Sequence, residues 1–260
     1  DSGAPRRELA RARAEQAYVD LEERHRGTEE EIRQRFRPYL ERLPRDGRAL
    51  DLGCGRGEAL ALLGEHGLEA CGVDASAAMV ALCRERGLEA VEGDLFEVLA
   101  GEVPGSLALV TCLHVIEHLP PEAVDRLARL AWRALEPGGT LLIETPNPLS
   151  LAVSARSFWI DPTHRRPVHP EGLAALVESA GFASIERLDL RPFDDEERLP
   201  EIALDGLGDE ARRLADRMNR LRDRLDALVF GYRDYGLLAL KPAAGDAARS
   251  SSPSGSPNPG

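Results

Sequence analysis

The sequence predicts an α/β fold in which a mainly parallel sheet is covered by helices on both faces. The first observation is that five short apolar runs alternate with amphipathic stretches between residues 48 and 146. Strands that alternate with helices pair in parallel through right-handed crossovers. The second is that residues 185–190 and 235–240 alternate as two further strands do. The third is the length of 260 residues, which is enough for one elaborated domain with a full core.

The elements of the central region follow one another in a regular order. The expected strands are the apolar runs at residues 49–52, 70–74, 88–91, 107–112 and 140–144. The expected helices lie between them, near residues 58–66, 77–85, 94–99 and 122–135. In a parallel sheet of this kind, ligands bind outside the carboxyl ends of the strands. Residues that directly follow the strands are therefore the first candidates for a binding site.

Further elements extend this region on both sides. Before it we expect two helices, from Pro5 to about Arg24 and from Thr28 to Leu43, the second opened by a capping box at its first residues. After it we expect a loop rich in Pro, His and Arg up to Pro170, a helix over 171–180, and a long charged helix inserted before the last strand.

These elements predict a single domain over residues 1–242. It divides into an N-terminal helical cap (1–46), a central core (47–146), and a region with a loop, the late strands and the inserted helix (147–242). Residues 243–260 are rich in Ser, Pro and Gly and poor in apolar side chains, so we expect a disordered tail.

The inserted helix carries a regular apolar seam. Its members recur at intervals of four, three, four and three residues, which is the spacing of coiled-coil a and d positions; they are Leu214, Met218, Leu221, Leu225 and Leu228. Because the seam is short, we expect this helix to pack on its own domain. An interface with a partner, such as a second copy in a homodimer, is the alternative.

The composition argues against several classes of protein. Lys and Arg number 33 against 45 Asp and Glu, a net charge of −12, which argues against a nucleic-acid-binding protein. The four cysteines have no disulfide or metal-ligand spacing, so we expect free thiols in a reducing compartment. No apolar run approaches the roughly 18 residues of a membrane span. We therefore expect a cytoplasmic protein.

The strongest local signal is a strand that runs into a glycine turn and then a helix, with the sequence DLGCGRG at residues 51–57. Gly53 and Gly55 allow the backbone to approach a ligand closely, and the helix start offers free N–H groups. Glu58 stands where a dinucleotide fingerprint has its third glycine, and a carboxylate there would repel a pyrophosphate. The turn therefore favours a ligand without phosphates.

Acidic residues end the next two strands. Asp74 ends the second strand, where a carboxylate can accept hydrogen bonds from both hydroxyls of a ribose. Asp94 follows the third strand, where it can take an adenine amino group while Leu95 and Met79 cover the faces of the ring. A helix cap is the alternative for Asp94.

Five motifs together make the sequence similar to the class I S-adenosylmethionine-dependent methyltransferases. They are the glycine turn, Gly72-Val73-Asp74, Gly93-Asp94, the HVIEHL segment at 114–119 and the LEPGG segment at 135–139. The resemblance covers residues 48–146, which makes 47–146 a cofactor-binding core. It implies a Rossmann-like sheet of seven strands, mostly parallel, with an antiparallel last strand, and S-adenosylmethionine as the cofactor.

The resemblance also implies which residues contact the cofactor. By position these are Gly53, Cys54 and Gly55 at the methionine part, Asp74 and Ala75 at the ribose, Met79, Asp94 and Leu95 at the adenine, and His114 beside the sulfonium. Tyr18 and Arg26 belong to the helical start, which often caps the cofactor in such folds, so we expect them to contact ligand as well.

Four further segments resemble a narrower bacterial group found with polysaccharide genes: HRGTEEEI at 25–32, ETPNP at 144–148, FWIDPTHRRP at 158–167 and FGYRDY at 230–235. The best-understood members terminate O-antigen chains by methylating a terminal phosphate, and they also carry a kinase domain, for which this chain has no room. The resemblance implies an acceptor among glycans or other small molecules, methylated on a phosphate or a hydroxyl.

The nucleophile decides which residues carry the chemistry. A hydroxyl needs a base near its operating pH, for which His118 and His164 are candidates. A phosphate is already anionic and needs only cations, for which Arg26, Arg165 and Arg166 are candidates as a clamp. Packing beside the cofactor is the alternative role for His118, and surface solvation is the alternative for Arg165 and Arg166.

Two functions of different classes follow. The first is an enzyme that transfers a methyl group in line to an acceptor oxygen, and the second is a non-catalytic module that binds a partner through the 205–230 helix. The intact glycine turn, Asp74 and Asp94 favour the enzyme. The spacing of His114, Glu117 and His118 also allows metal ligation, but a motif of this length is weak, and we expect no metal.

Overall fold

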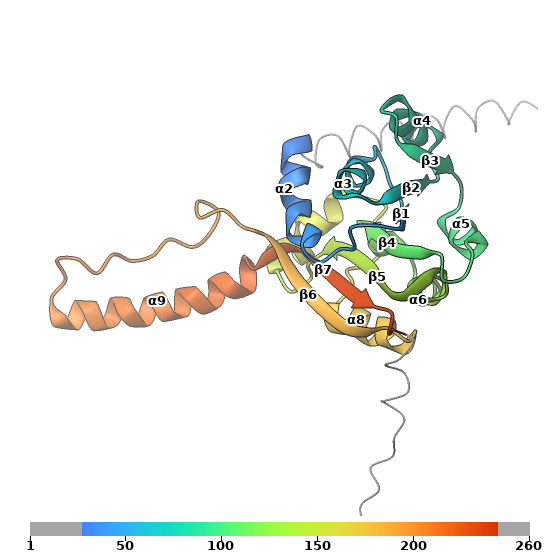
Figure 1. Ribbon diagram of the computed structural model, residues 1–260. Coiled ribbons are helices and arrows are strands. Elements are labelled where there is room, and N and C mark those ends of the chain that lie inside the picture. Colours follow the sequence, from blue (N-terminus) through green and yellow to red (C-terminus); the bar gives the residue numbers. More distant parts are fainter. Residues whose placement is uncertain (1–27, 244–260) are drawn as a thin grey trace, which may run out of the picture.

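The computed structural model describes residues 28–243, and these form the predicted α/β architecture (Figure 1). One seven-stranded sheet runs through them in the order β3-β2-β1-β4-β5-β7-β6. The strands are β1 (Arg48–Leu52), β2 (Glu69–Asp74), β3 (Glu89–Glu92), β4 (Leu107–Leu113), β5 (Leu135–Pro146), β6 (Ala183–Pro192) and β7 (Tyr232–Leu240).

The direction of the strands decides where a ligand can bind. Strands β1 to β5 are parallel, and the strand order reverses between β1 and β4, so the switch point lies at their carboxyl ends. Strand β7 inserts between β5 and β6 and is antiparallel to both, which confirms the predicted antiparallel last strand. Because β7 runs opposite to β5, its first residues lie at the same edge, where Asp234 pairs with Pro146.

Helices cover both faces of the sheet, as predicted. They are α2 (Glu29–Leu40), α3 (Glu58–His66), α4 (Ala77–Glu85), α5 (Leu95–Gly101), η1 (Ile116–His118), α6 (Pro121–Ala134), α7 (Leu151–Ala155), η2 (Ser157–Ile160), α8 (Pro170–Ser179) and α9 (Asp209–Val229). The predicted capping box opens α2, because the Thr28 hydroxyl accepts from the Glu31 amide while the Glu31 carboxylate accepts from the Thr28 amide. The helix expected over residues 5–24 and most of the expected tail lie outside the described residues.

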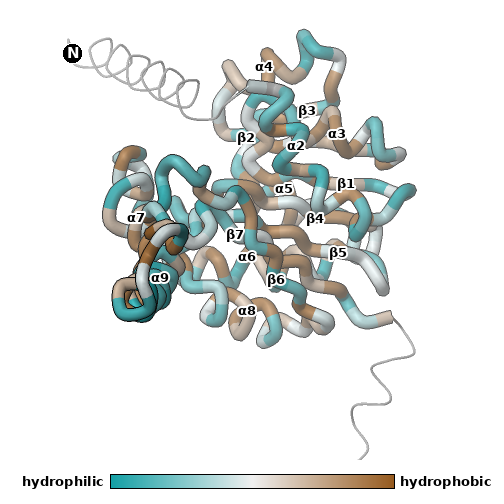
Figure 2. The backbone as a smooth tube through the Cα atoms, turned by 90° about the vertical axis from the view of Figure 1, so that its left-hand side faces the viewer, coloured by the Kyte–Doolittle hydropathy of each residue, from teal (hydrophilic) through white to brown (hydrophobic). Residues whose placement is uncertain are grey.

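Alternate side chains of the central strands fill two apolar layers. Val110 and Leu141 belong to the layer under α6 and α8, whereas their neighbours Leu109 and Leu142 belong to the layer under α2 and α3. Figure 2 shows these strands as hydrophobic tube segments within a more hydrophilic periphery. The sheet is thus buried on both faces, and its carboxyl-terminal edge is left for a site.

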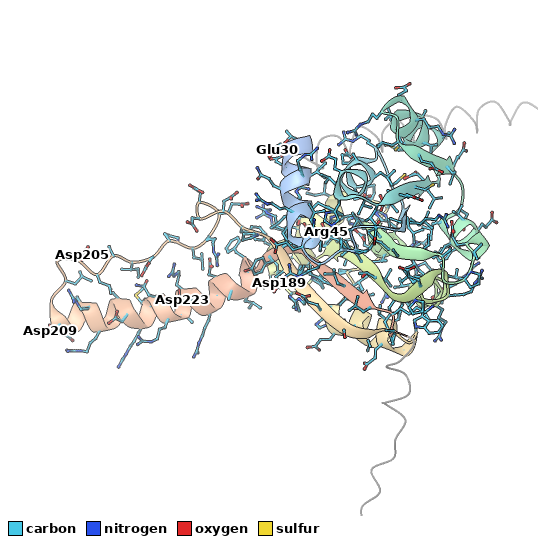
Figure 3. All side chains as sticks on the ribbon, viewed as in Figure 1. Glu30, Arg45, Asp189, Asp205, Asp209 and Asp223 are labelled. Atoms are coloured by element: carbon cyan, nitrogen blue, oxygen red, sulfur yellow. The ribbon has the colours of Figure 1, made fainter. Side chains whose placement is uncertain are left out.

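Helix α9 corrects one expectation. Together with the loop before it, it projects from the sheet as an arm (Figure 1), with Asp205 and Asp209 near its tip (Figure 3). The seam expected to pack on its own domain is exposed: Leu214 60%, Met218 50%, Leu221 59%, Leu225 45% and Leu228 52%. A different face is buried, because Asn219 exchanges hydrogen bonds with the backbone of Ile202 and Asp226 binds Arg198. The arm carries the seam beyond the core (Figure 1), so no surface within residues 28–243 lies opposite it.

No helix within residues 28–243 is both long enough and apolar enough to span a bilayer.

Candidate active site

A cavity of about 950 Å³ opens at the carboxyl ends of β1, β2, β4 and β5. Its volume falls in the range of roughly 300–1,000 Å³ that small-molecule sites occupy. Helix α2 and the segment from 157 to 164 supply its other walls. The sequence-predicted residues that line it are Gly53, Gly55, Asp74, Ala75, Met79, Asp94, Leu95, His114, His118 and His164.

The glycine turn after β1 forms the floor of the cavity. Gly53 has φ +73°, and a Cβ there would lie 2.5 Å from Cγ2 of Val115, so the close approach requires glycine. Gly55 also has a positive φ, of 53°. The sequence predicts a ligand without phosphates at this turn. Because the two glycines carry no side chains, a cofactor can approach the protein backbone closely there.

Asp74, at the end of β2, is held by two backbone amides. Its Oδ2 accepts from the Gly55 amide at 2.9 Å and its Oδ1 accepts from the Ser76 amide at 2.8 Å. A carboxylate offers about four acceptor positions, so two remain for ligand hydroxyls. The site therefore fits the ribose of the expected cofactor.

Asp94 caps a helix, which was the alternative role expected for it, and it also lines the cavity. Its Oδ1 caps α5 by accepting from the amides of Phe96 and Glu97. Met79 and Leu95 line the same part of the cavity, as expected for the two faces of an adenine ring. The cap fixes the Asp94 carboxylate while its second oxygen stays available to a ligand.

The side chain of Cys54 is not among the groups that line the cavity. It is buried behind the turn, where its Sγ would collide with a Cβ at Gly72, and it lies next to Cys83. Only the backbone of Cys54 belongs to the turn, through a hydrogen bond from its amide to the Val73 carbonyl. Tyr18 and Arg26 lie outside the described residues.

His114 is clamped between two carboxylates. Its Nε2 lies 3.0 Å from Glu144 Oε1 and its Nδ1 lies 3.4 Å from Glu117 Oε1. Burial would lower the pKa of His114, but the contacts with Glu117 and Glu144 outweigh it and raise the pKa well above the usual 6.5. The ring is 40% exposed, and it lines the cavity. Its φ of +55° is unusual for a residue with a side chain and turns the ring toward the site.

Sequence reasoning missed a second group of residues at this edge. The Tyr39 hydroxyl donates to Glu144 Oε2 at 2.5 Å, and Arg191 pairs with Asp234 at 2.7 Å. Glu144 follows the same strand-end rule that singled out Asp74, so the sequence held a signal for it. Asp234 lies at the start of a strand and reaches the site only because β7 is antiparallel.

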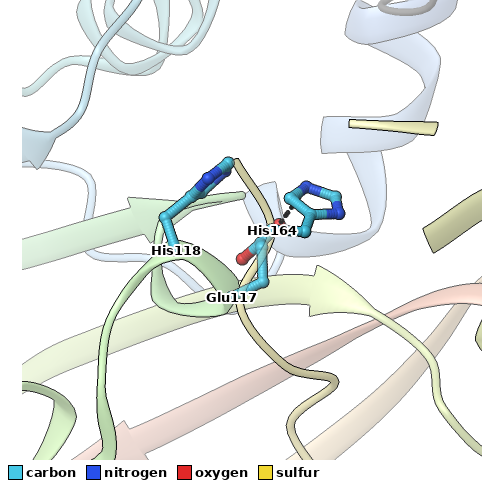
Figure 4. Close-up of side chains that lie close together, drawn as sticks. All are labelled: Glu117, His118 and His164. Carbon is cyan, nitrogen blue, oxygen red and sulfur yellow. Dashed lines mark ion pairs between the residues drawn. The ribbon is translucent and has the colours of Figure 1, made fainter. Parts of the chain in front are cut away.

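His118 and His164 come from distant segments and meet at the cavity wall (Figure 4). Their ring centroids are 4.7 Å apart. The loop that carries His164 is held against η1 by the Arg165 amide, which donates to the Glu117 carbonyl at 2.9 Å. The structure thus brings together both histidines that the sequence offered as bases.

Each of these two histidines has one ring nitrogen committed to a hydrogen bond. His164 Nδ1 lies 2.6 Å from the Phe158 carbonyl, which can only accept, so Nδ1 carries the proton. The Thr163 hydroxyl donates to Asp161 Oδ1, so it accepts from His118 Nδ1 at 2.9 Å. In their neutral forms both rings therefore present an unprotonated Nε2.

Two of the three arginines expected to form a clamp do not line the cavity, and the third, Arg26, lies outside the described residues. Arg165 is exposed, and neither it nor Arg166 is among the lining residues. The arginines that do line it are Arg35, Arg191 and Arg233. Of these, Arg191 pairs with Asp234 and Arg233 with Glu197, whereas Arg35 makes no hydrogen bond or ion pair within residues 28–243.

Comparison with known proteins agrees with this architecture. A family model described as "Methyltransferase domain" matches residues 22–187. The crystal structure of a SAM-dependent methyltransferase from Archaeoglobus fulgidus is 34% identical, with a TM-score of 0.79 over 86% of this chain and 99% of that one. Phosphoethanolamine N-methyltransferase 2 of Haemonchus contortus, solved with S-adenosylmethionine, shares the fold at 20% identity, with a TM-score of 0.56 over 86% of this chain and 59% of its own.

Among curated proteins, the ubiquinone biosynthesis O-methyltransferase of Pseudomonas aeruginosa is 33% identical over 150 residues. This match covers 52% of the present chain and 64% of the relative, so the chain spans less than two thirds of the length of that protein.

Proposed function

The chain belongs to the S-adenosylmethionine-dependent methyltransferases that share this domain, and we propose that it methylates a hydroxyl oxygen of a small-molecule acceptor. The observation that carries the proposal is the pair His118 and His164, which line the cavity with an unprotonated Nε2 in their neutral forms. A neutral hydroxyl is the nucleophile that needs such a group, because it must lose its proton as it attacks.

The residues divide the reaction between them. The glycine turn and Asp74 hold the cofactor, whose sulfonium carries the methyl group. The acceptor oxygen forms a bond to the methyl carbon while the carbon–sulfur bond breaks, leaving S-adenosylhomocysteine. The hydroxyl proton passes to Nε2 of His118 or His164. Alignment of the three reacting atoms can itself contribute several kcal/mol to the barrier reduction.

The cavity that the histidines line has apolar side chains beside the Asp161 carboxylate. Val115, Leu119, Phe158 and Ile160 line this part of the cavity. The phosphate alternative rested on Arg26, Arg165 and Arg166. Arg165 and Arg166 stand apart from the lining, and Arg26 lies outside the described residues. Arg35, by contrast, is a cation on the cavity wall that pairs with no residue among 28–243, so an acidic group on a hydroxylated acceptor is compatible with the site. The name of the Pseudomonas aeruginosa relative also points to oxygen as the methylated atom.

Substitution of the two histidines tests the proposal. We expect His118→Ala or His164→Ala to lower kcat on a hydroxylated acceptor about 100-fold or more. In both variants the binding of S-adenosylhomocysteine, measured by calorimetry, should stay unchanged. His66→Asn, at the far end of α3, is the matched control and should leave both kcat and this binding unchanged. Full turnover in the double histidine variant would remove the general-base role. No heat with S-adenosylhomocysteine would contradict the cofactor site itself.

We also propose a partner for the exposed seam of α9, namely a second copy of this chain. In an antiparallel pair, coiled-coil geometry places Met218 opposite Leu221 of the partner subunit and Leu214 opposite Leu225 of the partner subunit. The same register sets Glu210 beside Arg224 of the partner subunit, which is a favourable charge contact at each end of the pair. The arm would then mediate dimer formation, separately from the reaction in the cavity.

A further inference from the structure

A buried carboxylate oxygen beside the two histidines makes no hydrogen bond within residues 28–243, although it lies 3.4 Å from His114 Nδ1 in an ion pair. Glu117 is fully buried, and its Oε2 accepts from the Thr145 hydroxyl at 2.9 Å. Its Oε1 makes no hydrogen bond to any described residue. Leaving a buried acceptor unsatisfied costs free energy, so a group that fills this position stabilises the site.

Two histidines lie close to the Glu117 carboxylate. One ligand atom each of Glu117, His118 and His164 lies within 4.8 Å of the others (Figure 4). His164 Nε2 lies 4.0 Å from Glu117 Oε1 and 3.7 Å from Asp161 Oδ2. These distances are too long for hydrogen bonds. They match two ligand atoms that share one cation, since atoms each about 2.1 Å from a metal stand roughly 3.0–4.2 Å apart.

The histidines are already oriented as metal ligands are. A ligating imidazole binds through one nitrogen and donates the N–H of the other to a carbonyl, hydroxyl or carboxylate. His164 donates to the Phe158 carbonyl, and His118 donates to Thr163, which itself donates to Asp161. The protons are thus placed on Nδ1 in both rings, and Nε2 is the free ligand atom.

From this geometry we propose that Glu117, His118 and His164, with Asp161 as a fourth ligand, bind one divalent first-row transition metal ion. Two imidazole nitrogens favour Mn²⁺, Fe²⁺, Co²⁺ or Zn²⁺ over Ca²⁺ and Mg²⁺, which prefer all-oxygen sites. This departs from the absence of metal that the sequence predicts. The sequence showed only the Glu117-His118 pair, whereas the fold adds His164 and Asp161 from a distant loop.

The metal site rests on the proposed function for its role. His118, His164 and Asp161 line the cavity, so open coordination positions face the acceptor. A cation there would bind the acceptor oxygen and lower the pKa of its hydroxyl, which gives the same two histidines a role as ligands in place of bases.

The second cluster of potential ligands, His114, Glu144 and Asp234, is a weaker candidate. Its members are already satisfied, because His114 binds Glu144 and Asp234 binds Arg191. Among the described residues it lacks a buried oxygen without a hydrogen bond, which Glu117 Oε1 is.

Metal binding is tested directly on the full chain after treatment with a chelator. We expect calorimetry to find one Mn²⁺ or Zn²⁺ per chain, and Co²⁺ to give the visible absorption of a site with nitrogen ligands. Glu117→Gln, His164→Ala and Asp161→Asn should each weaken metal affinity at least tenfold. His66→Asn should leave it unchanged. Retained binding of S-adenosylhomocysteine shows that each variant is folded.

The outcomes separate this inference from the proposed function. Absence of Mn²⁺, Zn²⁺ and Co²⁺ binding by the folded wild-type chain overturns the metal site, and turnover of a hydroxyl acceptor in the presence of chelator then still supports the general base. Metal binding that survives all three ligand variants also overturns it. Site-dependent metal binding without methylation of any hydroxyl acceptor supports the metal site and counts against hydroxyl methylation.

Discussion

The hydroxyl of Tyr39 donates a 2.5 Å hydrogen bond to Oε2 of Glu144, which lies 105 residues further along the chain. Both side chains are buried, and the bond ties α2 to the end of β5. Burial, reinforced by the neighbouring Glu144 carboxylate, raises the pKa of Tyr39 far above its usual value, so the hydroxyl remains a donor at neutral pH. The contact therefore closes one wall of the cavity.

Tyr39→Phe should destabilise the fold by about 1–3 kcal/mol, because it leaves Oε2 of Glu144 without its donor in a buried environment. The free energy of unfolding in urea measures this. Tyr232→Phe is the matched control, since Tyr232 is 40% exposed and should change stability by no more than about 0.5 kcal/mol. Equal stability of the two variants would contradict the role of the bond.

Asp74→Asn should weaken S-adenosylhomocysteine binding about tenfold or more. The amide has only one acceptor oxygen, so it cannot satisfy the amides of Gly55 and Ser76 and also accept from a ribose. Calorimetric titration gives the affinity. Asp125→Asn, in an exposed pair with Arg129 on α6, controls for the loss of a charge and should bind as the wild type does.

The four cysteines should react slowly with a thiol reagent in the native protein at mildly alkaline pH. Burial raises the pKa of Cys54, Cys71, Cys83 and Cys112, so little thiolate forms. Cys71 is the most accessible and should react first. Addition of denaturant should release all four thiols, and rapid labelling of the buried three before denaturation would count against their placement.

Leu221→Glu should convert a dimer into a monomer, because it places a charge in the middle of the proposed α9 pairing. The mass in solution, measured by light scattering, reports this. Arg217→Gln should tighten the dimer, since the proposed register sets Arg217 close to Arg217 of the partner subunit. Asp223→Ala, outside the seam, should have no effect. A wild-type chain that stays monomeric at high concentration would refute the second copy as partner.

The attachment of the arm should depend on pH through Asp226. Burial raises the pKa of Asp226, but bonds from Arg198 and the Leu199 amide outweigh it and hold the pKa below its usual 3.8. Because the pKa of Asp226 is lower in the folded state than in the unfolded state, its ionised carboxylate stabilises the arm at pH values above the unfolded-state pKa. This stabilisation is lost as the pH falls from about 4 through the folded-state pKa.

At neutral pH, Asp226→Asn should therefore increase the rate of tryptic cleavage between residues 198 and 224 several-fold. Asp223→Asn removes only a surface pair with Arg222 and should leave the rate unchanged, because such pairs contribute little. Identical cleavage rates for the wild type and Asp226→Asn would show that this bond does not hold the arm.

The sequence by itself determined the order of the helices and strands and the site residues that directly follow the strands. Periodicity located the strands, and the rule that ligands bind at the carboxyl ends of parallel strands singled out Gly53, Asp74 and Asp94, because each lies within a residue or two of its own strand. His114 came from the motif resemblance, which also added the cofactor. These residues need only local chain geometry to reach the cavity.

The tertiary structure decided what depends on contacts between distant segments. It brought His164 against His118 and Glu117, placed Asp234 at the site through the reversed direction of β7, and left Arg165 and Arg166 outside the cavity. It also exposed the seam of α9, because the helix extends beyond the core and no surface of the described part of the chain covers it. Hydrophobic periodicity records which face of a helix is apolar, but only the packing of the whole chain determines what, if anything, lies opposite that face.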